Sequence, residues 1–265
     1  MQENTLNYKN NSVLVVAHPD DEILWFSSII KYVSTVIVCF SESNFNPTLT
    51  ESRQYFTDKN HFTKHTYLNL KESDVFHGAD WSNPILSDFG MKIEFKKNFI
   101  KEYNNNYYKL IELLGDKLDG YDNIFTHNPW GDYGHEEHVQ IYKVIKKLQE
   151  RLSYRIWVSN YCSNRSYKLM LQFGLRSDAD YHTLDINQNF CEMVKNLYLK
   201  HNCWTWYRDW NWFKEENYFD ENDLTYVSGS SSLKLPLNFV KIPMTNRTFL
   251  QKSHIYQSVR QLIRS

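Results

Sequence analysis

The feature that most constrains the fold is a short apolar run at residues 13–17, VLVVA, which is followed at once by a polar turn. Continuous runs rich in β-branched residues are typical of strands buried on both faces of a parallel sheet. The turn at 18–22, HPDDE, carries a proline and acidic residues where helices often begin, and residues 23–32 have helix-like apolar spacing. A second buried strand at 34–40 would complete a β-α-β unit.

Strand and helix patterns continue to alternate along the chain. The predicted helices lie near 51–62, 97–118, 135–152 and 187–201, and the predicted strands near 65–70, 123–126, 154–161 and 181–186. This alternation predicts an α/β fold, Rossmann-like, with a mostly parallel sheet flanked by helices. Because no repeat or linker divides the chain, we predict a single domain over 1–265. Its core would span about 12–165, and an aromatic-rich C-terminal extension would span about 166–265.

Composition argues against several classes of partner. The chain has 30 Lys and Arg against 31 Asp and Glu, well mixed along its length, whereas proteins that bind nucleic acid usually show a basic stripe. No apolar run approaches the roughly 20 residues of a membrane span. The first twelve residues are polar and lack the layout of a signal peptide, so we expect the protein to be cytoplasmic. Four scattered cysteines without a CxxC pair also suit a reducing compartment and disfavour a structural zinc knuckle.

Three residues of the first turn are candidates for a metal site. His18 and Asp21 stand three positions apart at a helix start, which places both side chains on one side, and imidazole and carboxylate both suit zinc. Asp20 lies between them and would remain available for proton transfer. Taken alone, this cluster is explained equally well by acidic residues at a helix N-terminus beside a histidine of the turn.

A second polar turn follows the strand predicted at 123–126. It reads THNPWGDYGHEEH over 126–138, and His135 and His138 are three apart at a helix start. Carboxyl ends of parallel strands meet at one edge of a sheet, so both turns should open onto the same rim. His18, Asp21 and His138 would then leave a fourth position open for water, as in catalytic zinc sites. Iron(II) is the alternative ion in vivo, because a His/His/Asp site with an open position accepts either metal.

The two turns together resemble the paired motifs of a known family. AHPDDE at 17–22 after a buried strand, with YGHEEH at 133–138 downstream, is similar to the LmbE/PIG-L zinc-dependent deacetylases. That family includes deacetylases of mycothiol and bacillithiol precursors and of N-acetylglucosaminyl-phosphatidylinositol. The resemblance covers roughly residues 12–165. It implies a Rossmann-like fold and a small-molecule substrate, an N-acetylated sugar conjugate of N-acetylglucosamine type, from which acetate is released and a free amine remains.

The resemblance also implies roles for individual residues. The zinc ligands would be His18, Asp21 and His138. Asp20 would be the general base, His135 would stabilise the tetrahedral oxyanion, and Tyr133 would support the same oxyanion.

Two further residues match the family's pattern more loosely. Glu137 stands where many members have an Asp that orients the catalytic His, and Arg53 resembles an Arg that lies near the substrate. The segment SESN at 41–44 departs from the Thr-Asp-Gly-Glu of many relatives. That departure bears on substrate contact and not on the metal site.

Aromatic residues make up 16% of the chain and gather at 204–213. Such a segment either stacks on a sugar or packs in a core or subunit interface, since Trp and Tyr dominate both. The spacing of Trp206 and Trp210 suits one helical face and favours packing. An exposed aromatic patch would also favour association into a homo-oligomer.

Three classes of function compete at this point. The first is a metal-dependent deacetylase, or a close relative that acts as an amidase on a non-sugar small molecule. The second is a metal-dependent phosphoesterase, which would want further carboxylates or a second metal. The third is a catalytically inactive metal- or sugar-binding module, which the presence of both Asp20 and His135 disfavours.

Overall fold

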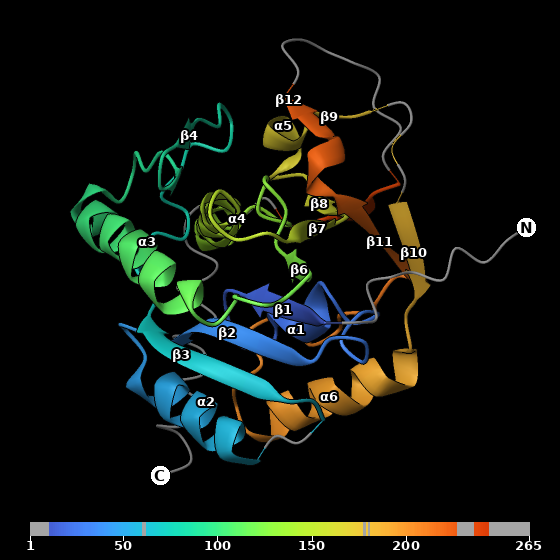
Figure 1. Ribbon diagram of the computed structural model, residues 1–265. Helices are drawn as coiled ribbons and strands as arrows, with labels where there is room; N and C mark the ends of the chain where they lie inside the picture. Colours follow the sequence, from blue (N-terminus) through green and yellow to red (C-terminus); the bar gives the residue numbers. More distant parts are fainter. Residues whose placement is uncertain (1–10, 60–61, 177–178, 180, 227–235, 244–265) are drawn as a thin grey trace, which may run out of the picture.

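A seven-stranded sheet forms the centre of the molecule. The computed structural model describes residues 11–59, 62–176, 179, 181–226 and 236–243. The strand order is β10-β11-β7-β6-β1-β2-β3 (Figure 1). The parallel part consists of β7 (Arg155–Ser159), β6 (Asn123–Thr126), β1 (Ser12–Val16), β2 (Thr35–Glu42) and β3 (His65–Lys71). The antiparallel strands β11 (Glu215–Asp220) and β10 (Tyr181–Asp185) extend it at one edge.

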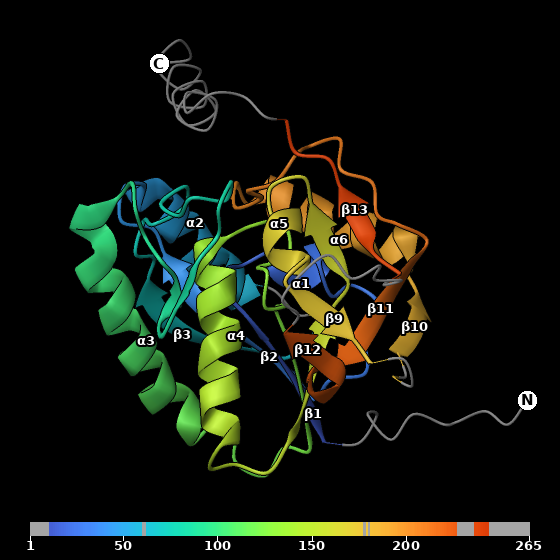
Figure 2. The ribbon, with the colours of Figure 1, turned by 90° about the horizontal axis from the view of Figure 1, so that it is seen from above.

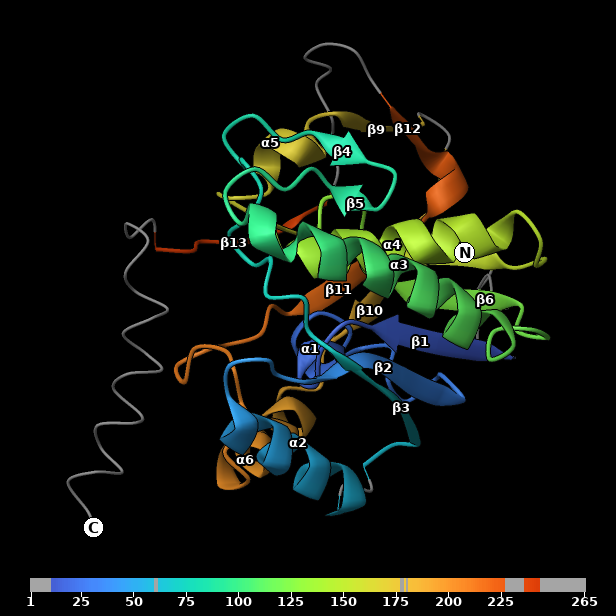
Figure 3. The ribbon, with the colours of Figure 1, turned by 90° about the vertical axis from the view of Figure 1, so that its left-hand side faces the viewer.

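Helices cover both faces of this sheet, which confirms the predicted α/β class. α3 (Ile100–Gly115) and α4 (Glu136–Gln149) lie on one face, and α2 (Pro47–Lys59) and α6 (Gln188–Lys200) lie on the other (Figures 1 and 3). Within β1 the side chains alternate between the two layers. Val13 and Val15 pack in the cluster that contains α3 and α4, whereas Leu14 and Val16 pack in the cluster that contains residues of α2 and α6. The uninterrupted apolar run is therefore a strand buried on both faces.

Smaller strand pairs lie outside the main sheet. They are β4 (Leu86–Ser87) with β5 (Gly90–Met91), β9 (Phe173–Leu175) with β12 (Leu224–Tyr226), and β8 (Tyr161–Ser163) with β13 (Asn238–Val240). The remaining short helices are α1 (Asp21–Leu24), α5 (Tyr167–Met170), and the 3-10 helices at Lys97–Phe99 and Glu221–Asp223. In the view from above, β9, β12 and β13 lie on the side of α4 away from α3 (Figure 2). Within the described ranges no helix is long and apolar enough to cross a membrane.

The helix predicted over 23–32 is wrong. α1 ends at Leu24, and the residues that follow form turns. Residues 21–30 are all buried, so this segment has no solvent-facing side of the kind that an amphipathic helix needs. The backbone N–H groups of Ser27 and Ser28 donate to the carboxylate of Glu216, at 3.2 and 2.9 Å, instead of continuing a helix.

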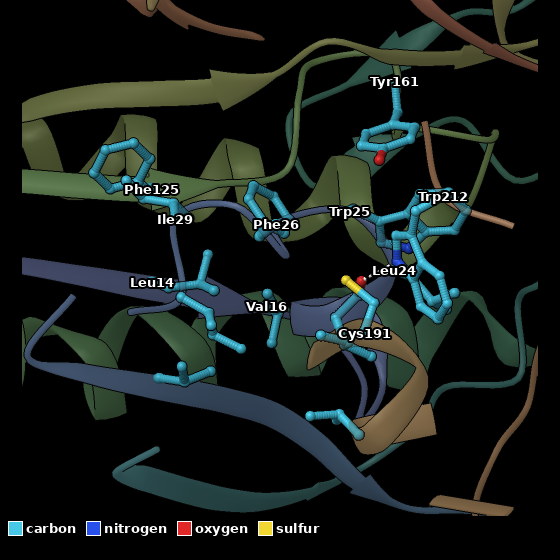
Figure 4. Packing of buried hydrophobic residues seen from close by; sticks show 14 of the residues in the cluster. Leu14, Val16, Leu24, Trp25, Phe26, Ile29, Phe125, Tyr161, Cys191 and Trp212 are labelled. Atoms are coloured by element: carbon cyan, nitrogen blue, oxygen red, sulfur yellow. Dashed lines mark hydrogen bonds between the residues drawn. The ribbon is translucent and has the colours of Figure 1, made fainter. Parts of the chain in front are cut away.

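Glu216 is the anchor that holds this segment against β11. Its carboxylate also accepts from the hydroxyls of Ser27 and Ser28, at 2.9 and 2.6 Å, and from those of Tyr161 and Tyr218, at 3.0 and 2.6 Å. The side chain is fully buried. Figure 4 shows the apolar side chains around this region, including Trp25. Hydroxyl and amide donors thus satisfy a buried carboxyl group that joins the segment after α1 to β11.

We expect Glu216→Ala to lower the free energy of unfolding by about 3 kcal/mol, because two buried N–H groups and several hydroxyls lose their acceptor. Urea unfolding followed by circular dichroism would measure it. The matched control is Glu215→Ala, since the Glu215 carboxylate has no hydrogen bond to any described residue. An equal loss in the two variants would contradict the assigned role of Glu216.

Candidate metal centre and active site

The two polar turns leave the sheet at the same edge. β1 and β6 are parallel neighbours, with Val15 paired to Thr126, and the chain continues from each into a turn. β2 lies on the far side of β1 from β6, so the strand order reverses at this point. In open α/β sheets such a switch point is where ligands bind. The rings of His18 and His138 are brought to a centroid separation of 5.5 Å there.

Among the described residues, ligand atoms within 4.8 Å of one another form two groups that share His138: His18, His135 and His138, and Asp21, His127 and His138. Asp21 also lies close to His18. Asp21 Oδ2 lies 3.3 Å from His18 Nδ1 and 3.2 Å from His138 Nε2. Neighbouring ligands of a tetrahedral zinc ion are separated by about 3.3 Å when the bonds are about 2.0 Å long. His138 Nε2 is buried and accepts no hydrogen bond from any described residue. A metal ion would satisfy this lone pair, so His138 and its neighbours in the two groups fit such an ion.

Asp21 and the two histidines beside it shift one another's pKa. Burial lowers the pKa of His18, but hydrogen bonds to Asp21 and Glu137 outweigh burial and raise it to about 10. Burial opposes ionisation of Asp21 as well, yet the neighbouring His138 and His18 hold its pKa well below the usual range. Burial lowers the pKa of His138, but attraction to Asp21 and hydrogen bonds to Asp132 and Asp21 together outweigh burial and raise it. These are the shifts of a buried carboxylate that attracts positive charge to the two imidazoles beside it.

Behind the ligands, Asp132 holds two histidines. Its Oδ2 lies 2.9 Å from Nδ1 of His138 and 2.6 Å from Nδ1 of His127. The first contact directs Nε2 of His138 towards Asp21, as is typical of the residues behind a metal ligand. His127 also lies within reach of an ion shared with Asp21 and His138. However, its Nε2 accepts the N–H of Ala17 at 2.8 Å, so both of its nitrogens are already engaged.

Sequence reasoning did not assign His127 and Asp132. Both lie within the polar turn at 126–138, so the signal was present in the motif. Their roles depend on which ring nitrogen meets which partner, and residue spacing does not contain that information.

His135 lies beside His18 and His138 with its Nδ1 engaged by the backbone. Its ring lies 4.7 Å from that of His18 and 4.8 Å from that of His138. Nδ1 accepts the backbone N–H of Glu137 at 3.1 Å, so a neutral ring carries its proton on Nε2. Burial, reinforced by the charges of His18 and His138, holds its pKa well below the usual range. Phe76 stacks on this ring at 4.5 Å with an interplanar angle of 9°.

Asp20 occupies a constrained position at the same turn. Its backbone is left-handed, with φ of 89°, and its side chain is buried. Oδ2 accepts the backbone N–H of Thr205 at 2.7 Å and its hydroxyl at 2.8 Å. Burial, with the nearby charge of Asp21, raises the pKa of this carboxyl to about 8, which makes it a stronger base than an ordinary aspartate. Thr205 was not predicted by the sequence analysis.

The carboxylate of Glu137 contacts His18 and not His135, the histidine it was expected to orient. Oε2 lies 2.9 Å from Nε2 of His18, and Oε1 accepts the N–H and hydroxyl of Ser73 at 2.7 and 2.6 Å. The residue was expected to orient His135 through its side chain. Because glutamate is one methylene longer than aspartate, the carboxylate reaches across to the first turn, and only its backbone N–H meets His135. Glu137 thus orients a candidate ligand.

Arg53 lies near Asp20, and Tyr133 lies beside His135 and His138. Arg53, on α2, is 3% exposed and makes an ion pair with Glu72 at 2.5 Å. Its charge also lowers the pKa of Asp20, against the larger effect of burial. The ring of Tyr133 is 5.3 Å from that of His138 and 5.8 Å from that of His135.

The aromatic segment over 203–213 contributes to both core and site. It contains turns and no helix, so the helical face predicted for Trp206 and Trp210 is wrong. The rings of both tryptophans pack instead on Trp25, at 5.1 and 5.8 Å. Trp25 in turn donates its indole N–H to Oδ1 of Asp21 at 2.9 Å. The favoured packing interpretation is confirmed for Trp204 and Trp212, which are buried in the core.

Comparisons with known proteins assign no family. No family model matches the chain. An uncharacterised protein of Acanthamoeba polyphaga mimivirus is 20% identical over 208 residues, which cover 74% of this chain and 83% of that protein.

Solved structures show a distant likeness. An N,N'-diacetylchitobiose deacetylase from Pyrococcus horikoshii is 12% identical, with a TM-score of 0.44 and coverage of 73% of this chain and 71% of that one. An antimicrobial-reagent pseudoaglycone deacetylase is 10% identical, with a TM-score of 0.46 and coverage of 83% and 100%. A deacetylase of teicoplanin biosynthesis, in complex with teicoplanin, is 7% identical, with a TM-score of 0.45 and coverage of 82% and 98%. These values are too low to transfer a family or an activity to this chain.

We expect Trp25→Phe to weaken zinc binding about ten- to a hundredfold, because Asp21 Oδ1 loses the donor that orients it. Competition with a chromogenic chelator would measure the dissociation constant. The control is Trp157→Phe, which removes a buried indole bonded to Asn123 at 2.9 Å, away from the ligands. If both variants weakened zinc binding equally, Trp25 would have no specific role at the metal centre.

Proposed function

We propose that this protein hydrolyses the N-acetyl amide of an N-acetylglucosamine-type sugar conjugate and releases acetate and a free amine. In this proposal His18, Asp21 and His138 hold a zinc ion, or iron(II) in vivo. The observation that carries it is the position of Asp21 Oδ2, 3.3 Å from His18 Nδ1 and 3.2 Å from the unpartnered Nε2 of His138. The resemblance of the two motifs to the LmbE/PIG-L deacetylases supports the choice of substrate class.

The proposed chemistry needs a base, and Asp20 suits that task. When bound, a divalent ion supplies Lewis acidity, which makes water a better nucleophile and an amide carbonyl a better electrophile. Asp20 takes the proton of the attacking water and later delivers it to the departing amine. Its raised pKa, about 8, lets one carboxyl group both accept and return a proton near neutral pH. Oδ1 is the oxygen available for this transfer, because Oδ2 accepts both hydrogen bonds from Thr205.

The developing oxyanion needs donors, and His135 provides one. Nδ1 of His135 accepts from the backbone, so Nε2 carries the hydrogen that would point to the substrate oxygen. Tyr133, beside the rings of His135 and His138, would supply a second donor through its hydroxyl. Donors fixed before the reaction stabilise charge more effectively than water that must reorganise.

The described residues favour an amidohydrolase over a two-metal phosphoesterase. The two groups that could hold an ion share His138, and His127 in the second group has both nitrogens engaged. A two-metal site requires separate ligand sets for ions about 3.5–4 Å apart. A cytoplasmic location and association into a homo-oligomer stay predictions.

The first test is acetate release by the zinc-loaded protein from a panel of N-acetylglucosamine conjugates. We expect Asp20→Asn to retain zinc and to lose about a hundred- to a ten-thousandfold in turnover, because the general base is removed. Asp21→Asn, the matched control, should lose zinc as well. Zinc content by mass spectrometry separates the two effects. Loss of zinc in Asp20→Asn would make Asp20 a ligand, and silence of the zinc-loaded protein across the panel would refute the proposed function.

A second prediction concerns His135. We expect His135→Ala to lower kcat about a hundred- to a thousandfold with zinc content unchanged, which is the usual effect of removing one oxyanion donor. His182→Gln, on β10 at the edge of the sheet, is the control and should keep full activity. A variant at His135 that raised KM and left kcat unchanged would assign the residue to substrate binding instead.

A further inference from the structure

One residue of the aromatic segment, Thr205, reaches the proposed base, and the proposed function assigns it no task in turnover. Thr205 donates both its backbone N–H and its hydroxyl to the same oxygen, Oδ2 of Asp20, at 2.7 and 2.8 Å. The two residues are 185 positions apart. Asp20 is 1% exposed, so both bonds reach a carboxylate that is shielded from solvent. Among the described residues, Oδ1 of Asp20 receives no hydrogen bond.

Packing on either side of Thr205 fixes its position. Cys203 and Trp204 are buried in the core, and Trp206 packs on Tyr133 at 4.6 Å and on Trp25 at 5.1 Å. Thr205 itself is exposed, so burial of its side chain does not explain its orientation. Its hydroxyl is a second donor directed at an oxygen that the backbone N–H already reaches.

The contact also separates Asp20 from its neighbour Asp21. Oδ2 of Asp20 already accepts two hydrogen bonds, which disfavours this oxygen as a metal ligand. Asp20 has a left-handed backbone, with φ of 89°, its side chain makes no capping hydrogen bond to α1, and α1 begins at the next residue. Adjacent aspartates therefore meet different partners: Asp21 meets the histidines, and Asp20 meets Thr205.

We propose that Thr205 is a positioning residue for the general base. By holding Oδ2 with two hydrogen bonds it fixes the rotation of the Asp20 carboxylate, so that Oδ1 faces the water and amine between which the proton moves. This inference rests on the proposed function. It adds that Thr205, which lies outside both sequence motifs, is required for turnover and not for metal binding.

The test compares two variants of the full-length, zinc-loaded protein. Thr205→Val keeps the shape and the backbone N–H but removes the hydroxyl, whereas Thr205→Ser keeps the hydroxyl. We expect Thr205→Val to lower kcat about ten- to a hundredfold, the equivalent of one hydrogen bond to a charged group, with KM and zinc content unchanged. Thr205→Ser should restore most of the activity. Thr225→Val, whose hydroxyl meets the carbonyl of Gly174, is the control.

Hydrogen exchange tests the same contact without a substrate. The amide of Thr205 should be protected in the wild-type protein, and Asp20→Ala should remove that protection.

Several outcomes would overturn the inference. Full kcat in Thr205→Val, or a change confined to KM, would overturn the positioning role while leaving the proposed function in place. Unchanged protection of the Thr205 amide in Asp20→Ala would overturn it from the structural side alone. If the wild-type protein turned over no member of the panel, the proposed function would fail first, and the positioning role would fail with it.

Discussion

The site depends on one buried negative charge, the carboxylate of Asp21. An uncompensated carboxylate in a protein interior costs several kcal/mol, so its partners must all be in place when the chain folds. Oδ2 accepts the backbone N–H of His18 at 2.7 Å, and Oδ1 accepts the indole N–H of Trp25 at 2.9 Å. His138 approaches from α4, which follows a different strand. Parallel pairing of β1 and β6 is what brings these groups to one place.

Other buried charges around the centre follow the same logic. Asp132 meets two imidazoles, Glu137 meets His18 and Ser73, and Glu216 is held by hydroxyl and amide donors. Each is satisfied by several partners, and a polar network that is fully satisfied makes a local structure rigid and specific. The rotations of His18 and His138 are therefore set by contacts behind them, before any ion or substrate arrives.

Local patterns predicted the frame of the molecule well. The apolar runs at 13–17 and 123–126 are buried strands, and parallel pairing placed the polar turns after them at a common edge. Apolar spacing predicted a helix over 23–32. The prediction is wrong because the N–H groups of Ser27 and Ser28 donate to Glu216, a distant acceptor that spacing does not reveal. Periodicity similarly suggested a helical face at Trp206, where packing on Trp25 determined an irregular path.

The candidate site was predictable to the extent that its residues lie in two contiguous motifs. The motifs located the histidines and the acidic residues that now lie together, but not the direction in which each side chain points. Glu137 illustrates this, since one additional methylene carries its carboxylate to His18. Thr205 could not be predicted as a site residue, because it is recognised only by its contact with Asp20, 185 positions earlier in the chain.

That separation along the chain has a consequence during protein synthesis. A nascent chain that has emerged from the ribosome only as far as α4 already carries His18, Asp21 and His138, but neither Thr205 nor Glu216. In the proposed function, a chain at that stage therefore carries the candidate ligands, but the carboxylate of Asp20 lacks its anchor and the segment after α1 lacks β11. The base can be positioned only after the chain has been completed through β11, which makes the proposed activity a property of the nearly full-length chain.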